Sequence, residues 1–253
     1  SNCKWLLVSY FKESCYTMYK EVIRMKCKVT FIYHSGYFVE MEDCCLLFDY
    51  YKGKLPNYDH RKPLYIFVSH AHEDHYQKKI FTFMKTYHNV TCILPDDINT
   101  NENVCHMHAS QILHLNGLRI ESFPSSDEGL AYLVEVNGKS IYHAGDLNWW
   151  HWQDENSDAE NEEAKALFYH GIEKLKHRHI DIAFLVLDPR QEEQFYYGMD
   201  AYLHEMDIDY VFPMHMWKNY KIVEKMKRLT QSAGYRDKIM DVKEENQQFT
   251  IEV

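Results

Sequence analysis

Three histidines and an aspartate within six residues, placed directly after an apolar stretch, constrain this chain more than any other feature. Residues 64–68 form a continuous apolar run of strand length, which predicts a buried strand. His70, His72, Asp74 and His75 follow it after a single serine. Imidazole and carboxylate groups are metal ligands, and sites in sheet proteins are assembled at strand ends. The spacing is not that of HExxH, so it predicts one loop that serves two adjacent metal ions.

Two later strand ends offer the further donors that a two-metal site needs. Residues 141–143 read as a strand followed by Gly145 and Asp146, and residues 211–212 as a strand that leads to His215. A glycine permits close approach of the backbone, and a carboxylate can bridge two ions. Either strand end alone is weak evidence. Together with the first loop they predict a dinuclear site.

The order of elements indicates an α+β fold. We predict strands in the first half around a helix over residues 76–87, and a second half in which helices over residues 159–176, 199–206 and 220–231 alternate with strands. Two sheets packed face to face with helices outside satisfy this order. We expect residues 25–253 to form one catalytic domain and residues 1–24 to be an N-terminal extension, for which a helix is one option.

With these motifs the chain resembles the metallo-β-lactamase superfamily, whose signature is HxHxDH followed by a histidine, an aspartate after a glycine, and a last histidine. The phrases at Tyr142 to Asp146 and Val211 to His215 are most similar to the branch that includes ascorbate-phosphate lactonase. The resemblance covers about residues 25 to 240 and implies the αββα sandwich of two mixed sheets flanked by helices.

The resemblance also implies a ligand set and the metals. His70 and His72 would bind the first ion, Asp74, His75 and His215 the second, and Asp146 would bridge them. Zinc is the first expectation for both ions, and manganese or iron are the alternatives.

One departure from the family pattern concerns the first ion. The usual third histidine is expected after Ile120, but residues 122–129 contain none. Asp127, a serine or a water could take its place, or the first site could be weak; an oxygen donor would favour manganese or iron. His106 and His108 lie earlier and are interpreted as structural.

The expected reaction is hydrolysis of a small-molecule ester, lactone or phosphoester bond. Paired ions about 3.5 to 4 Å apart would hold a hydroxide as the nucleophile. Asp74 is the predicted catalytic residue, because it could orient or deprotonate that water. A phosphodiesterase or nuclease of the same fold, and a silent binding protein with a degraded site, are the alternatives.

The roles of three further residues stay open at this point. His34 sits in a predicted hairpin turn, which in the resembled branch approaches the site. His151, among the tryptophans after Asp146, is the best additional candidate for a substrate pocket. Asp188 follows a predicted strand and could hydrogen-bond a ligating imidazole, or pair with Arg190 instead.

Charge and cysteine content narrow the partners and the location. The net charge of −10 disfavours nucleic acid as a partner, so a small-molecule substrate is expected. The seven cysteines show no CxxC spacing, which is typical of reduced thiols in the cytosol. The longest apolar run near the start, residues 5–8, is too short for a membrane span. The sequence does not indicate the oligomeric state.

Overall fold

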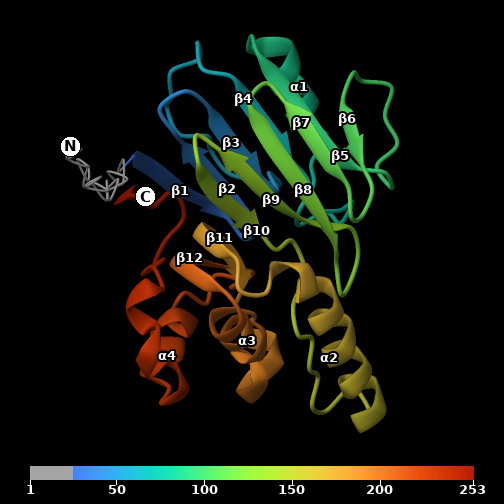
Figure 1. Ribbon diagram of the computed structural model, residues 1–253, viewed down its shortest axis with the longest axis vertical. Coiled ribbons are helices and arrows are strands. Elements are labelled where there is room, and N and C mark those ends of the chain that lie inside the picture. The colour runs from blue at the N-terminus through green and yellow to red at the C-terminus, as the bar shows by residue number, and fades with distance from the viewer. Residues whose placement is uncertain (1–24) are drawn as a thin grey trace, which may run out of the picture.

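Two β-sheets packed face to face form the centre of the protein, as a computed structural model of residues 25–253 shows (Figure 1). The predicted N-terminal extension, residues 1–24, lies outside the described residues. The strand order is β13-β1-β2-β3-β4-β5-β6 in the first sheet and β12-β11-β10-β9-β8-β7 in the second. The strands of the first sheet are β1 (Lys26–Tyr33), β2 (Gly36–Glu40), β3 (Cys45–Phe48), β4 (Leu64–Phe67), β5 (Val90–Pro95), β6 (Cys105–Met107) and β13 (Gln248–Glu252). Those of the second are β7 (Ile112–Leu115), β8 (Leu118–Pro124), β9 (Leu130–Val136), β10 (Lys139–His143), β11 (His179–Val186) and β12 (Asp207–Met214).

Helices cover the outer faces of the two sheets. In Figure 1, α1 lies beside the first sheet, and α2, α3 and α4 gather at the second. The α-helices are α1 (Ile80–Thr86), α2 (Asp158–Ile172), α3 (Tyr197–Glu205) and α4 (Lys221–Arg228). Short 3₁₀ helices are η1 (Glu173–Leu175), η2 (Pro189–Gln194), η3 (Gln231–Gly234) and η4 (Arg236–Lys238). The predicted αββα sandwich of two mixed sheets is confirmed.

Alternation of side chains explains why the first sheet is buried on both sides. Successive strand residues point to opposite faces. In β4, Tyr65 and Phe67 therefore join the core between the sheets, while Leu64 and Ile66 pack in a second core together with residues of α1. This double burial accounts for the continuous apolar run in the sequence, since a strand covered on both faces needs no polar side.

The structure differs from the predicted elements chiefly in three places. The helix predicted over residues 220–231 ends at Arg228, because Leu229 is extended. The helix predicted over residues 76–87 begins only at Ile80, because the preceding residues turn back: the amides of His75 and Tyr76 both donate to the His72 carbonyl, at 3.0 and 2.9 Å. Strand β13 was not predicted. It pairs antiparallel with the edge of β1, and Ile251 is its one buried residue, so the sequence carries little alternation there.

None of the helices in the described part of the chain combines the length and the apolar character that a membrane crossing requires.

Candidate metal centre

The carboxyl ends of five strands meet at one edge of the sandwich, and each delivers a polar residue there. The pairs β3–β4 and β10–β11–β12 run parallel, so their ends share one side of each sheet. The strands are followed by Asp49, the His70 to His75 loop, Asp146, Asp188 and His215, respectively. The β1–β2 turn adds His34. All six residues predicted as metal ligands lie at this edge, and their role as ligands stays a prediction.

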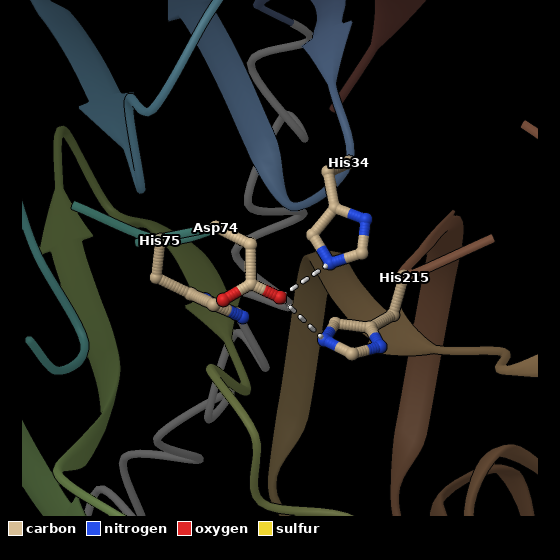
Figure 2. A group of neighbouring side chains, drawn as sticks. All are labelled: His34, Asp74, His75 and His215. Carbon is tan, nitrogen blue, oxygen red and sulfur yellow. Dashed lines mark ion pairs between the residues drawn. The ribbon is translucent and has the colours of Figure 1, made fainter. Parts of the chain in front are cut away.

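The donors divide into two clusters whose ligand atoms lie within 4.8 Å of one another. One contains His34, Asp74, His75 and His215, and the other His70, His72 and Asp146. The first cluster contains the three residues predicted for the second ion together with His34, and the second contains the two predicted for the first ion together with Asp146. In Figure 2 the carboxylate of Asp74 points between His34 and His215, with distances of 3.2 and 3.8 Å from its Oδ2 to the two Nε2 atoms.

Asp146 stands between the two clusters. Its Oδ1 lies 3.1 Å from His75 Nε2 and 3.5 Å from His215 Nε2, whereas its Oδ2 faces His70 Nε2 at 3.7 Å. One carboxylate oxygen thus faces each cluster. This is the arrangement that a ligand bridging two ions requires.

Unsatisfied buried atoms show that the residues fit a metal. The Nε2 atoms of His34, His70, His75 and His215, and Oδ1 of Asp146, are buried without a hydrogen-bond partner within residues 25–253. Their mutual distances are short, but the directions are not those of hydrogen bonds. Unpaired buried polar groups are costly, and atoms that converge in this way are satisfied by a shared cation.

Hydrogen bonds to the other ring nitrogens fix which nitrogen of each imidazole faces the centre. His75 Nδ1 donates to Asp49 Oδ2 at 2.7 Å and His215 Nδ1 to Asp188 Oδ2 at 2.8 Å. Ser69 Oγ lies 2.7 Å from Asp49 Oδ2 and donates to it, so it accepts from His70 Nδ1 at 2.8 Å. In the neutral form of each ring, Nε2 then has its lone pair toward the centre, as in metal-binding histidines.

Asp188 accepts hydrogen bonds from both of the partners proposed for it from the sequence, a ligating imidazole and Arg190. Besides His215 it accepts from Arg190, whose Nη2 lies 2.5 Å from Oδ2. The two interpretations were therefore not alternatives. Burial raises the pKa of Asp188, but the hydrogen bonds from His215 and Arg190 outweigh it and lower the pKa below the usual range.

The backbone is strained at three of the site residues. His34, Asp49 and His215 have φ values of 53°, 43° and 64°, in the left-handed region that residues other than glycine rarely adopt. Each such conformation costs on the order of 1–3 kcal/mol and is retained where the surrounding structure demands it. Positive φ values also occur at loop residues elsewhere, but at these three positions the conformation sets where a site side chain lies.

Two glycines permit the close approach of the loops. A Cβ at Gly145 would lie 2.7 Å from Ser69 Cβ, and one at Gly129 would lie 2.1 Å from the Ser69 carbonyl oxygen. Gly145 thus provides the close approach expected beside Asp146. Because Gly129 has no side chain, residues 125–129 can lie directly against the loop that begins at His70.

Two other sequence candidates have contrasting positions. Asp127 lines a cleft of about 440 Å³ together with His72, Asp74 and Asp146, but it is not part of the tight clusters. His151 lies instead against Tyr197, with Nε2 3.1 Å from Gln153 Oε1, and is not among the residues that line this cleft. The structure therefore does not bring His151 to the site.

Sequence reasoning missed Asp49, Glu128 and His143. Asp49 follows β3 as Asp146 follows β10, so the same strand-end rule would have found it. Glu128 Oε2 lies 3.3 Å from His72 Nε2. His143 accepts from the Gly145 amide and donates to the Ser35 carbonyl, at 3.1 and 3.0 Å, and so ties together the two loops that carry Asp146 and His34.

Comparison with known proteins places this architecture in a family. The model of the beta-lactamase superfamily domain matches residues 28–163, more than half of the chain. The chain belongs to the beta-lactamase superfamily. A relative named UPF0173 metal-dependent hydrolase, from Desulforamulus reducens, is 29% identical over 140 residues, which are 47% of this chain and 61% of the relative. The chain thus matches less than two thirds of that relative's length.

Solved structures share the fold at low identity. Igni18, a metallo hydrolase from Ignicoccus hospitalis, is 19% identical with a TM-score of 0.60, covering 90% of this chain and 99% of its own. The metallo-beta-lactamase fold protein YhfI from Bacillus subtilis is 13% identical, with a TM-score of 0.58, over 89% of this chain and 99% of YhfI. CmlA, a diiron β-hydroxylase from Streptomyces venezuelae, is 11% identical, with a TM-score of 0.56, over 90% of this chain and 54% of CmlA.

The ionisation of the donors predicts how the stability of the metal-free protein varies with pH. Burial lowers the pKa of His75, but Asp146 and Asp49 outweigh it and raise the pKa well above the ordinary value. A raised folded pKa stabilises the fold below the unfolded value of about 6.5, and this contribution is lost as pH rises through the folded pKa. Burial raises the pKa of Asp146, but the facing imidazoles lower it further, so its contribution is lost only as pH falls.

We therefore expect the metal-free protein to lose stability as pH rises above about 6.5. A bound cation would replace the proton on His75, so the metal-loaded protein should not show this loss. Burial lowers the pKa of His70 to about 4, so this donor is already neutral throughout that range. Urea unfolding between about pH 6 and pH 9, with chelator or with saturating metal, measures the difference. If the free energy of unfolding varied with pH in the same way in the metal-free and metal-loaded forms, His75 would not be a metal ligand.

Proposed function

We propose that this protein is a metal-dependent hydrolase that cleaves an ester, lactone or phosphoester bond in a small molecule. The observation that carries the proposal is the convergence of four buried Nε2 atoms and an Asp146 oxygen, all without hydrogen-bond partners among residues 25–253. Relatives named metal-dependent hydrolases support it. When bound, a pair of divalent ions supplies an activated water and neutralises negative charge on a substrate oxygen.

The chain's own residues would orient the reactants. Asp74 borders the cleft; burial raises its pKa, but the facing imidazoles of His34, His75 and His215 outweigh burial and hold the pKa below the usual range. A carboxylate with a depressed pKa accepts hydrogen bonds well but is a weak proton acceptor. We therefore assign Asp74 to metal binding and to orienting the attacking water. Trp150 and Trp152, stacked with centroids 5.7 Å apart, form an apolar wall of the cleft.

The donor chemistry indicates the metal, and the net charge of the chain indicates the class of substrate. Three imidazoles in the cluster of His34 suit zinc, which we propose first, and the more oxygen-rich cluster of His70 and His72 admits manganese or iron. We keep a small molecule as the substrate over nucleic acid because of the net charge of −10. The cytosolic location stays a prediction.

Reconstitution tests the proposal. The protein is freed of metal with chelator, reloaded with zinc, manganese or ferrous iron, and assayed on aryl esters, lactones and an aryl phosphodiester. We expect up to two ions per chain and hydrolysis that depends on them. Binding of less than about a tenth of an ion, with no gain on reloading, would refute the proposal. Cleavage of the phosphodiester alone would favour the phosphodiesterase alternative.

We propose that Asp127 completes the cluster of His70 and His72 in place of the third histidine. Asp127 lines the cleft beside His72, and partial desolvation and the neighbouring Asp146 raise the pKa of its carboxyl group. A cation between these acids would reverse this shift. Glu128 would fix the ring of His72 from the outside.

Asp127→Asn should weaken binding of one of the two ions by at least about tenfold and leave the other almost unchanged. The cluster of His34 keeps all of its donors in this variant. Metal titration with a chromophoric chelator as competitor measures the two affinities. Asp96→Asn, which changes an exposed aspartate paired with His108, is the control. Two unaltered affinities in Asp127→Asn would leave a water or serine as the substitute.

A further inference from the structure

One cationic side chain enters the proposed substrate cleft. Arg190 belongs to η2, immediately after the end of β11, and lines the cleft of about 440 Å³ together with His72, Asp146 and His215. About half of its side chain is exposed, at 49%. The guanidinium therefore lies beside the candidate metal centre and remains accessible to a ligand.

The guanidinium is held rigidly from one side. Its Nε lies 3.1 and 3.0 Å from Asp188 Oδ1 and Oδ2, and its Nη2 lies 2.5 Å from Oδ2. Asp188 is fully buried and does not move freely. Two indole rings flank the cation, with its central carbon 4.5 Å from the Trp217 centroid and 5.6 Å from that of Trp152. Arginine stacks on aromatic faces in this way, and the stacking fixes the plane of its fork.

The outer edge of the fork is free. Among the hydrogen bonds found within residues 25–253, none is donated by Nη1 of Arg190. Burial lowers the pKa of Arg190, but Asp188 raises it further, so the group stays charged. A planar, pre-oriented guanidinium with an unused N–H edge is suited to bind a carboxylate or a phosphate.

The charge balance of the cleft is compatible with an anion once metal is bound. Asp74, Asp127 and Asp146 line the same cleft and would repel an anion in the metal-free protein. Two divalent ions would outweigh these three carboxylates, and the Arg190 charge would then add to a positive field. Anion binding at Arg190 should therefore require the metal-loaded protein.

We propose that Arg190 is an anion-recognition residue, and that the substrate of this cleft is a small ester or lactone bearing a carboxylate or phosphate group away from the scissile bond. This inference rests on the proposed function, because it assigns the substrate class to the same site. Arg190 binds the non-reacting end of the substrate, and Trp152 and Trp217 contact the part between.

The chain contains a matched arginine for comparison. Arg61 is bonded to Asp59 in the same pattern, backbone amide included, with Nε 2.9 and 3.1 Å from the two carboxylate oxygens and Nη2 2.7 Å from Oδ2. Its side chain is 90% exposed, and it does not line the cleft. Arg61→Gln therefore removes the same kind of ion pair without touching the site.

The first test compares two rigid esters of one leaving group on the metal-loaded protein: 4-nitrophenyl benzoate, which is neutral, and mono-4-nitrophenyl terephthalate, whose para carboxylate cannot reach the ester carbonyl. We expect Arg190→Gln to lower the ratio of kcat/KM for the anionic ester to that for the neutral one by about tenfold or more. Arg190→Lys should lower it less, and Arg61→Gln should leave it unchanged. A role confined to supporting Asp188 and His215 would lower both rates equally, and an unchanged ratio overturns the proposal.

The second test measures binding without turnover. Inorganic phosphate is titrated calorimetrically into the metal-loaded wild type and the same variants. We expect about tenfold weaker binding in Arg190→Gln and wild-type affinity in Arg61→Gln. If Arg190→Gln binds phosphate as tightly as the wild type and the ester ratio is unchanged, the anion site is rejected. Hydrolysis by the wild type would still support the proposed function in that case. Weaker phosphate binding in a protein that cleaves neither ester supports the anion site and counts against the hydrolase.

Discussion

Asp146→Asn should remove at least one of the two metal ions and lower hydrolysis by roughly a thousandfold, since bound ions contribute about 4 kcal/mol or more to transition-state stabilisation. The reason is geometric. Oδ1 of Asp146 faces His75 and His215, and Oδ2 faces His70, so this carboxylate has one oxygen toward each cluster. The asparagine amide is nearly the same size as the carboxylate, but it has one oxygen in place of two and no charge.

Elemental analysis of the purified variant, with activity on the best ester or lactone, checks this expectation. Asp209→Asn is the control, because Asp209 belongs to an exposed cluster with His179 and Asp207 that also could hold an ion. This control should keep the metal content and rate of the wild type. If Asp146→Asn retains two ions, or if Asp209→Asn loses one, the centre has been assigned to the wrong carboxylate.

The part of the site that could be predicted from sequence is the part whose signal is local. His70, His72, Asp74 and His75 lie together in six residues after a buried strand, and Asp146 and His215 each follow a strand of their own. For such residues, the strand-end rule suffices to bring them to one edge once the two parallel strand groups are in place.

His34 needed the three-dimensional packing of the sheets. It lies on the turn between β1 and β2, about forty residues before the histidine loop, and a turn histidine has no spacing that marks it as a ligand. Contact with β12 positions it: the His215 amide donates to the His34 carbonyl at 3.2 Å. Neither the residues around His34 nor those around His215 indicate in the sequence that these two backbone groups form a hydrogen bond.

The residues that hydrogen-bond to the proposed ligands or their loops were harder to predict from sequence than the proposed ligands themselves. Asp49, which contacts Ser69 and His75, follows a strand and could have been found by the strand-end rule, whereas His143 acts through two backbone groups and belongs to no motif with fixed spacing. The fold itself was predictable, because burial of both faces of a strand appears directly as an apolar run. The end of the chain was not, since β13 takes its shape from pairing with β1.

Asp49→Asn should weaken metal binding by about 10- to 100-fold while the protein still folds. Asp49 is fully buried and accepts from the Ser69 amide and hydroxyl, both at 2.7 Å, and from His75 Nδ1. The asparagine retains one oxygen for the Ser69 amide, but its NH₂ group then faces His75. His75 Nδ1 must become the acceptor, which places the ring proton on Nε2, where the lone pair for the metal is needed.

The same loss of a buried acceptor should lower the free energy of unfolding by about 1–3 kcal/mol, and this effect has a close control elsewhere in the chain. Asp181 is also buried and also accepts from a serine amide and hydroxyl, those of Ser140, at 2.8 and 2.9 Å, but it contacts none of the proposed ligands. Asp181→Asn should therefore lose comparable stability and keep the metal affinity of the wild type. Chelator competition together with urea unfolding separates the two effects. Equal metal affinity in both variants would show that Asp49 supports the fold without setting the proton on His75.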